Sequence, residues 1–133
     1  MKKSMGRSGF IVAAVLLAAA LLPIVGASDD RATSPPREFR LVAKDMTFYL
    51  EGHSTPNPTL RVRAGEQIRL VLRNETPGMS HDLVIKPWQV QTPMLATEGE
   101  EAAVSFRVPD RTGTETYNCT PHAEMMRGSI TIE

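Results

Sequence analysis

Cysteine is nearly absent from this sequence: Cys119 is the only one among 133 residues. A single thiol cannot form a disulfide within its own chain, so a fold stabilised by internal disulfides is excluded. In an oxidising compartment a thiol without a partner is expected to be buried or bound to a metal ion. The chemistry of Cys119 must therefore be sought among the other residues of the chain.

Other scarcities exclude further classes of protein. Aromatic residues make up 5% of the chain, and its 15 basic residues are balanced by 15 acidic ones without forming a stripe. A nucleic-acid-binding surface normally needs such a stripe, so the sequence predicts no nucleic-acid partner. Histidine occurs only three times, at His53, His81 and His122. That is too few for the several copper sites of a multicopper oxidase or a nitrite reductase.

The chain has one long apolar run, residues 10–22, and basic residues precede it. Small residues follow at positions 25–27, and this order is typical of a secretory signal peptide with its cleavage site. We therefore predict removal of residues 1–27 and a periplasmic or secreted protein. The alternative is a permanent anchor, which is the only membrane contact that the sequence indicates. The run is short for a crossing and Pro23 follows it closely, which favours cleavage.

The chain after the signal segment has the size of one small domain. Residues 28–36 are polar and contain proline, which predicts a flexible lead, and residues 37–133 predict one domain with a single core. Loss of the three basic residues of the signal segment leaves 12 Lys and Arg against 15 Asp and Glu. The exported domain is therefore expected to be mildly acidic.

Short segments in which apolar and polar residues alternate recur along residues 37–133, with turn-forming residues between them. β-branched residues are enriched in these segments, which favours strands over helices. The segments are 39–43, 46–50, 60–63, 68–73, 82–85, 102–108, 114–118 and 128–132. About eight such strands predict an all-β fold, an antiparallel Greek-key β-sandwich or barrel. Only residues 88–100, around Met94 to Glu98, could hold a short helix.

The segment from Cys119 to Met126 concentrates soft metal ligands. Within eight positions it offers a thiolate, the imidazole of His122 and two thioethers, and His81 is a second candidate imidazole upstream. Two imidazole nitrogens and a thiolate in one plane, with a weak axial thioether, form the ligand set of a mononuclear blue-copper site. Cys119 ends one predicted strand and Gly128 opens the next, so the residues between them form a loop that can wrap around a metal ion.

Other uses of these residues are weaker. A structural zinc site normally supplies four strong nitrogen or sulfur ligands, whereas the fourth ligand here would be a soft thioether, which favours copper. A cysteine–histidine hydrolase needs an orienting residue and an oxyanion hole, and the loop from Cys119 to His122 supplies neither. The binuclear copper centre of respiratory oxidases needs two cysteines in this loop. The sequence therefore predicts that the protein is not an enzyme.

The residues around these ligands resemble a known family. The segments in question are Gly78–Ile85, Tyr117–His122 and Met126–Ile132. They are similar to the ligand segments of the cupredoxins, the small blue copper proteins of the plastocyanin/azurin kind, and a weaker resemblance extends over residues 38–133. The resemblance implies a cupredoxin-like fold and one type 1 copper ion. The copper ligands that it implies are His81, Cys119, His122 and a methionine.

The spacing of the loop distinguishes two adjacent methionines. Three residues separate His122 from Met126, as in azurin-like proteins, whereas plastocyanin-like proteins usually have four. An arginine and a glycine follow Met126, again as in the azurin-like pattern. The resemblance therefore selects Met126 rather than Met125 as the axial ligand. The Cys-x-x-His spacing is instead plastocyanin-like, which makes the loop a hybrid of the two patterns.

Asp82 departs from the pattern of the family, because many members carry asparagine after the first histidine. In those proteins the asparagine amide ties the two ligand segments together. We expect Asp82 to accept hydrogen bonds from Thr120 or from a backbone N–H of the same segment. We also expect its negative charge to favour Cu(II), because groups that surround the ligands tune the metal.

The resemblance further implies a carrier of single electrons that cycles between Cu(II) and Cu(I), acting as a monomer. Redox partner proteins would dock near the edge of His122, against an apolar surface. That surface would comprise Met79, Pro87, Trp88, Met94, Pro121, Ala123 and Met125. The main alternative is an exported copper-binding protein for copper delivery or storage. His53 lies outside the motif and is expected to be exposed to solvent.

Overall fold

The computed structural model describes residues 35–133. The predicted signal peptide, residues 1–27, and most of the predicted lead lie outside the described residues. Within residues 35–133, no helix has the length and apolar character that crossing a membrane would need.

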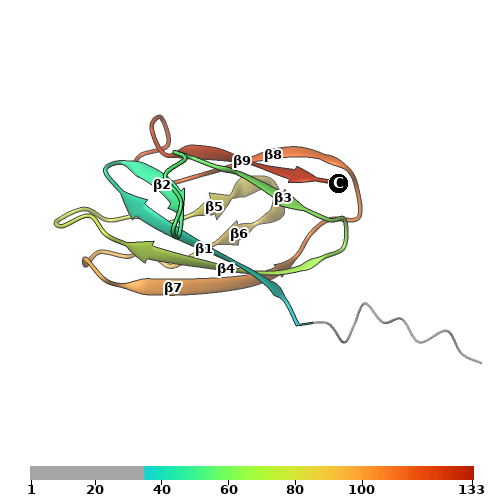
Figure 1. The fold of residues 1–133 in the computed structure, drawn as a ribbon, viewed down its shortest axis with the longest axis horizontal. Coiled ribbons are helices and arrows are strands. Elements are labelled where there is room, and N and C mark those ends of the chain that lie inside the picture. The colour runs from blue at the N-terminus through green and yellow to red at the C-terminus, as the bar shows by residue number, and fades with distance from the viewer. Residues whose placement is uncertain (1–34) are drawn as a thin grey trace, which may run out of the picture.

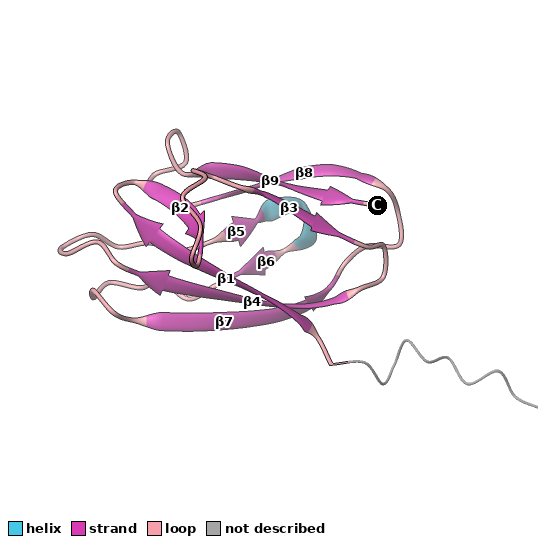
Figure 2. Cartoon of the chain, in the orientation of Figure 1, coloured by secondary structure: helices cyan, strands magenta, loops and turns pink. Residues whose placement is uncertain are grey.

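Nine strands of the described chain form two sheets that face each other (Figure 1). The first sheet, in the order β2-β1-β4-β7, comprises β1 (Arg37–Lys44), β2 (Thr47–Leu50), β4 (Gln67–Asn74) and β7 (Glu101–Arg107). The second sheet, in the order β3-β9-β8-β5-β6, comprises β3 (Thr59–Val62), β5 (Val84–Ile85), β6 (Val90–Gln91), β8 (Gly113–Asn118) and β9 (Arg127–Ile132). The short 3-10 helix η2 (Lys86–Trp88) joins β5 to β6 (Figure 2).

The alternation that identifies the strands also builds the core between the sheets. In β4, Ile68, Leu70 and Leu72 are buried, whereas Gln67 and Arg69, which alternate with them, are exposed. The second sheet contributes Tyr117 of β8 and Ile130 of β9, both fully buried. Burying one such side chain contributes about 1.5–3 kcal/mol. The shared core therefore fixes the two sheets, and with them the strand ends, in one arrangement.

The prediction of an all-β sandwich of about eight strands is confirmed, but the possible helix was wrong. Residues 94–98 form no helix, because Leu95 pairs instead with His81 in an isolated β-bridge. Within residues 35–133, the helical turn is η2, which lies earlier in the chain. Strand β6 was not expected, since its two residues are too few to show an alternation.

The sheets are mixed rather than purely antiparallel. β1 runs parallel to β4, and β3 runs parallel to β9, whereas the other neighbouring strands pair antiparallel. Alternation in a sequence reports which face of a sheet a residue occupies and carries no information on the direction of the neighbouring strand. The difference therefore concerns a property that the pattern could not predict.

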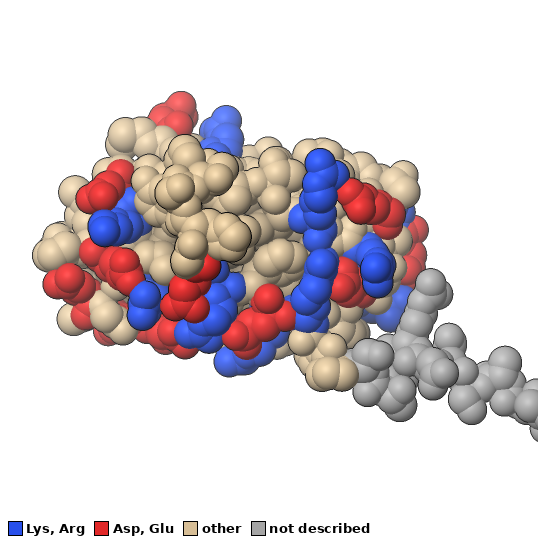
Figure 3. Space-filling view, viewed as in Figure 1, with Lys and Arg blue, Asp and Glu red and all other residues tan. Residues whose placement is uncertain are grey.

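Acidic and basic side chains lie intermixed on the face of the domain that shows the first sheet (Figure 3). Arg40 of β1 contacts Glu38, Glu51 and Glu101 at 3.1, 3.0 and 2.6 Å. A hydrogen bond from Arg40 lowers the pKa of Glu38 below its ordinary value. Because all four side chains are partly exposed, each pair is expected to contribute little to stability.

Candidate metal centre

The three predicted nitrogen and sulfur ligands meet at one end of the sandwich. His81, Cys119 and His122 each place one ligand atom within 4.8 Å of the others. Cys119 directly follows the last residue of β8. Because β5 pairs antiparallel with β8, the residues just before β5, which include His81, lie at the same end.

His81 is held by a β-bridge rather than by a regular strand. Its backbone exchanges two hydrogen bonds with Leu95, at 2.9 and 2.8 Å. The buried side-chain amide of Asn74 donates to the carbonyls of Met79 and Leu95, at 2.8 and 3.3 Å. The regular strand begins only at Val84. The bridge and the Asn74 amide therefore position this ligand, and sequence reasoning identified neither.

The loop between β8 and β9 is closed by hydrogen bonds of its own backbone. The N–H of Cys119 donates to the carbonyl of Met126 at 3.0 Å. The N–H groups of Met125 and Met126 both donate to the carbonyl of His122, at 3.1 and 2.9 Å. The loop is therefore a compact turn that directs the side chains of Cys119 and His122 to the same point.

Close packing explains the glycine that follows this loop. Gly128 lies directly opposite Tyr117 in the β8–β9 register. A Cβ atom on Gly128 would lie 2.2 Å from Cζ of the Tyr117 ring, which is fully buried. Any larger residue would have to displace this ring, so the start of β9 requires glycine.

Both imidazoles direct Nδ1 toward the thiol. Nδ1 of His81 lies 3.7 Å and Nδ1 of His122 lies 3.6 Å from Sγ of Cys119. The two imidazole centroids are 5.0 Å apart. A metal ion bonded to sulfur at about 2.3 Å and to nitrogen at about 2.0 Å, as zinc is, separates the two atoms by about 3.7 Å at a trigonal angle. The three side chains thus fit around one ion.

Burial sets the protonation behaviour of this site. Burial, together with the neighbouring His122, lowers the pKa of His81 and so favours the neutral imidazole, the form that binds metals. Burial also raises the pKa of the Cys119 thiol. Nε2 of His81 is buried, and no hydrogen-bond partner for it is found in the described part of the chain. His81 and Cys119 thus hold their ligand atoms in the interior of the domain.

Asp82 links the two ligand segments, as expected. Its fully buried carboxylate accepts hydrogen bonds from the N–H and the hydroxyl of Thr120, both at 2.6 Å. The side-chain amide of Gln91 on β6 donates a third, at 3.0 Å. Sequence reasoning missed Gln91, since nothing in the pattern around it indicates that β6 reaches this carboxylate.

The two adjacent methionines of the loop lie in opposite environments. Met126 is fully buried, whereas Met125 is 56% exposed. Met125 thus points outward, as expected, while Met126 lies in the interior of the domain with Cys119. Met79 and Met94 are also exposed, so three thioethers reach solvent near the two ligand segments.

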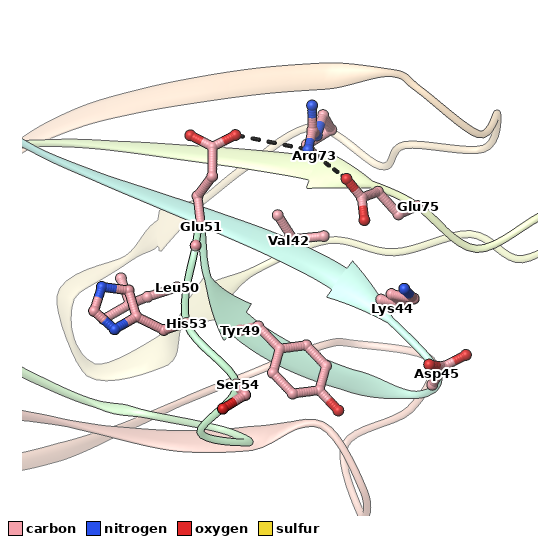
Figure 4. Close-up of a pocket in the computed structure, with 11 residues that line it drawn as sticks. Val42, Lys44, Asp45, Tyr49, Leu50, Glu51, His53, Ser54, Arg73 and Glu75 are labelled. Carbon is pink, nitrogen blue, oxygen red and sulfur yellow. Dashed lines mark hydrogen bonds and ion pairs between the residues drawn. The ribbon is translucent and has the colours of Figure 1, made fainter.

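His53 does not belong to the cluster of the other two histidines. It is exposed, as expected, and lines a surface pocket of about 320 Å³ beside β1 and β2 (Figure 4). In this pocket Arg73 contacts the carboxylates of Glu51 and Glu75 (Figure 4). Arg73, Glu51 and Glu75 are therefore paired with one another.

A sandwich of two β-sheets that brings two histidines and a buried cysteine together at one end defines the class of cupredoxins. The family model of copper binding proteins, plastocyanin/azurin family, matches residues 54–133. This match covers more than half of the chain, and the chain therefore belongs to that family. The cluster of His81, Cys119 and His122 fits a single type 1 copper ion.

Solved structures with a similar fold include blue copper proteins. Auracyanin A, a "blue" copper protein from Chloroflexus aurantiacus, superposes with a TM-score of 0.57 at 17% identity, covering 74% of this chain and all of that one. Auracyanin from Roseiflexus castenholzii gives 0.57 at 15% identity, with 75% and 99% covered. The McoA multicopper oxidase of Aquifex aeolicus gives 0.60 at 16% identity, over 73% of this chain and 26% of the oxidase. No protein of curated function matches the sequence.

Proposed function

We propose that this protein is an exported one-electron carrier that cycles one copper ion between Cu(II) and Cu(I) and catalyses no reaction. The observation that supports it most directly is the position of two imidazole Nδ1 atoms, 3.7 and 3.6 Å from the buried Sγ of Cys119. Membership of the plastocyanin/azurin family supports the metal. The similar fold of auracyanin A, a "blue" copper protein, supports the class of function.

The proposal assigns four ligands. Nδ1 of His81, Nδ1 of His122 and Sγ of Cys119 would form the plane around copper, and the Met126 thioether would be the weak axial ligand. The burial of Met126, and the hydrogen bond that its carbonyl accepts from the N–H of Cys119, support Met126 as the axial ligand. The exposure of Met125 argues against the neighbouring thioether.

Bound copper supplies the redox couple, and the protein supplies a fixed geometry. The bridge to Leu95 holds His81, and the closed loop holds Cys119 and His122. Ligands that are fixed by the backbone move little when the charge of the ion changes. The free energy needed to reorganise the site on electron transfer therefore stays small.

A redox partner would dock around His122. This residue is half-buried, so part of its side chain reaches the surface, while His81 and Cys119 are fully buried. Met79, Met94 and Met125 are exposed and provide apolar surface near the two ligand segments. We propose that the protein acts as a monomer that brings this face against its partners. Export rests on the signal-like sequence of residues 1–27.

The exposed methionines also favour a second candidate function. Thioethers select Cu(I), and Met79, Met94 and Met125 are 40%, 47% and 56% exposed. A protein for copper delivery or storage would use such groups to take up and release the ion. It would bind Cu(I) in preference to Cu(II) and exchange it readily.

Copper titration of residues 28–133 tests the carrier function. One Cu(II) ion per chain is expected to produce the intense visible absorption of thiolate-to-copper charge transfer. Cys119→Ser and His122→Ala should abolish this absorption. His53→Ala, which removes a histidine outside the cluster, should preserve it. Blue colour that survives Cys119→Ser would contradict the proposal.

The same titration distinguishes delivery or storage. A protein that stays colourless with Cu(II), yet binds Cu(I) after Cys119→Ser, would support the alternative. Binding should then be lost only when Met79, Met94 and Met125 are all replaced by leucine. These replacements nearly conserve side-chain volume, so they test the thioethers rather than the packing.

A further inference from the structure

Asn57 has a backbone conformation that few residues adopt. Its φ is +46°, in the left-handed region, where asparagine is one of the better tolerated residues other than glycine. Pro56 and Pro58 flank it, and each proline ring fixes its own φ. The segment from Pro56 to Pro58 is therefore a stiff turn, in which Asn57 can hold its side chain in one direction.

One side of Asn57 is bound to the edge of the first sheet. Its backbone N–H donates to the carbonyl of Phe48 at 2.7 Å, and its Oδ1 accepts the N–H of Phe48 at 3.1 Å. β2, which contains Phe48, is the outer strand of its sheet, and the Phe48 side chain is fully buried. Asn57 therefore pairs with the backbone of Phe48 in the way that a residue of a neighbouring strand would, and the buried side chain of Phe48 keeps that backbone in place.

The other side of Asn57 reaches the loop between β8 and β9. Nδ2 of Asn57 donates to the carbonyl of Met125 at 2.9 Å, although the two residues are 68 positions apart. The same peptide group continues into the N–H of Met126, which donates to the carbonyl of His122 at 2.9 Å. The peptide group that enters Met126 is thus held at its oxygen by Asn57 and at its nitrogen by His122.

The neighbouring residue contacts the start of the same loop. The carbonyl of Pro58 accepts a hydrogen bond of 2.6 Å from the hydroxyl of Tyr117, which lies two residues before Cys119. The turn from Pro56 to Pro58 therefore contacts both β8, the strand that leads into the loop, and the loop itself at Met125. Through Phe48 it also ties the loop to the opposite sheet.

We propose that Asn57 is a positioning residue for the axial side of the copper site. By fixing the Met125–Met126 peptide group, it would set the position from which the Met126 side chain reaches the copper site. The weak axial contact is the one most sensitive to such a shift, because the imidazoles and the thiolate hold the ion more strongly. The inference rests on the proposed copper site.

Two variants separate this role from a general effect on the fold. Asn57→Asp keeps the shape and the acceptor for the Phe48 N–H but, when ionised, cannot donate to Met125. Asn57→Gly suits the left-handed backbone and removes both side-chain hydrogen bonds. Asp45→Gly is the matched control, because Asp45 also has a left-handed φ, +48°, and lies in the turn between β1 and β2.

Both Asn57 variants are expected to bind copper, to shift the midpoint potential and to alter the ratio of the visible absorption bands. Asp45→Gly should change neither. In the metal-free proteins the Met126 amide should exchange its hydrogen about fivefold faster or more in both Asn57 variants, since a hydrogen bond worth about 1 kcal/mol is lost. Unchanged amide exchange together with an unchanged spectrum would overturn the inference.

The amide measurement keeps the two proposals separate. If the wild-type protein shows no thiolate-to-copper absorption, the proposed function fails, while faster exchange at Met126 would still show that Asn57 positions the loop. If the wild type is blue and the Asn57 variants match Asp45→Gly in potential, spectrum and exchange, only the role of Asn57 is rejected.

Discussion

At the scale of single residues, a buried carboxylate distinguishes this site from the pattern of its family. Asp82 is fully buried and receives hydrogen bonds from Thr120 and Gln91 instead of an arginine or lysine. These donors stabilise the ionised carboxylate without cancelling its charge. A negative charge next to His81 favours the more highly charged Cu(II) over Cu(I).

We therefore expect Asp82→Asn to raise the midpoint potential of the copper protein. At an effective dielectric constant of about 20, a unit charge about 6–15 Å away is worth about 1–3 kcal/mol, or roughly 40–130 mV for one electron. Spectroelectrochemical titration would measure the shift. Asp110→Asn is the control, since it removes an exposed carboxylate from the turn between β7 and β8, at the other end of the sandwich. A potential that is unchanged or lower in Asp82→Asn would contradict this prediction.

Sequence reasoning predicted His81, Cys119 and His122, which the structure brings together, but not the residues that hold them. Cys119, His122 and Met126 lie within one short loop, so their spacing alone suggested a shared role. His81 is distant in sequence; it was a candidate imidazole from the residues alone, and the family resemblance then implied it as a ligand. Asn74 and Asn57 act through contacts between segments far apart in the chain, and in the sequence they look like ordinary turn residues. A single sequence contains no sign of such contacts.

At the scale of elements, the side chain of Glu100 closes a turn in the segment after Leu95, where the sequence alone allowed a short helix. The carboxylate of Glu100 accepts hydrogen bonds from the N–H groups of Ala96 and Thr97, at 2.7 and 2.9 Å. With these donors satisfied locally, Leu95 is free to pair with His81. Local composition allowed a short helix, but pairing with the distant segment that contains His81 decided the structure.

This turn predicts a pH-dependent contribution to stability. The hydrogen bond from Thr97, with that from Ala96, lowers the pKa of Glu100 below its ordinary value. A carboxyl group with a lowered pKa stabilises the fold above its ordinary pKa, and this stabilisation is lost as the pH falls through the lowered value. We expect Glu100→Gln to lower the free energy of unfolding near neutral pH, and the difference from wild type to shrink in acid.

Urea unfolding of the metal-free protein at a series of pH values, from about 7 to about 3, measures this difference. Glu98→Gln is the matched control, because Glu98 is an exposed glutamate of the same turn. The two variants should differ at neutral pH and converge in acid. A difference between wild type and Glu100→Gln that stays constant or grows in acid would show that the hydrogen bonds of this carboxylate do not stabilise the turn.

The strands themselves were predictable to the extent that they alternate. β4 and β7 are long, and apolar residues that pack in or against the core recur at every second position in both, so the positions of these strands were predicted within a few residues. β5 and β6 have two residues each and are defined by their partners. Pairing direction, as in the parallel pair of β1 and β4, is likewise a property of two segments and not of one.

At the scale of the whole molecule, the apolar core between the sheets holds the ends of the strands in place for the copper site. The outer face of the first sheet carries many ion pairs, yet these are exposed to solvent. Exposed pairs contribute about 0–1 kcal/mol each, whereas truncation of a buried leucine costs about 2–5 kcal/mol. The core should therefore dominate stability, and the ion pairs should matter chiefly for solubility.

Two variants on the same sheet test this ranking. Leu70 of β4 is fully buried, while Arg40 of β1 contacts three glutamates and is 38% exposed. We expect Leu70→Ala to lower the free energy of unfolding by about 2–5 kcal/mol at any salt concentration. Arg40→Gln should cost about 1 kcal/mol or less, and this cost should fall as salt screens the pairs. Urea unfolding at low and high sodium chloride measures both. The ranking would be contradicted if Arg40→Gln lowered the free energy of unfolding as much as Leu70→Ala does. In that case the ion pairs, and not the core, would hold the first sheet in position, including Phe48, which Asn57 contacts.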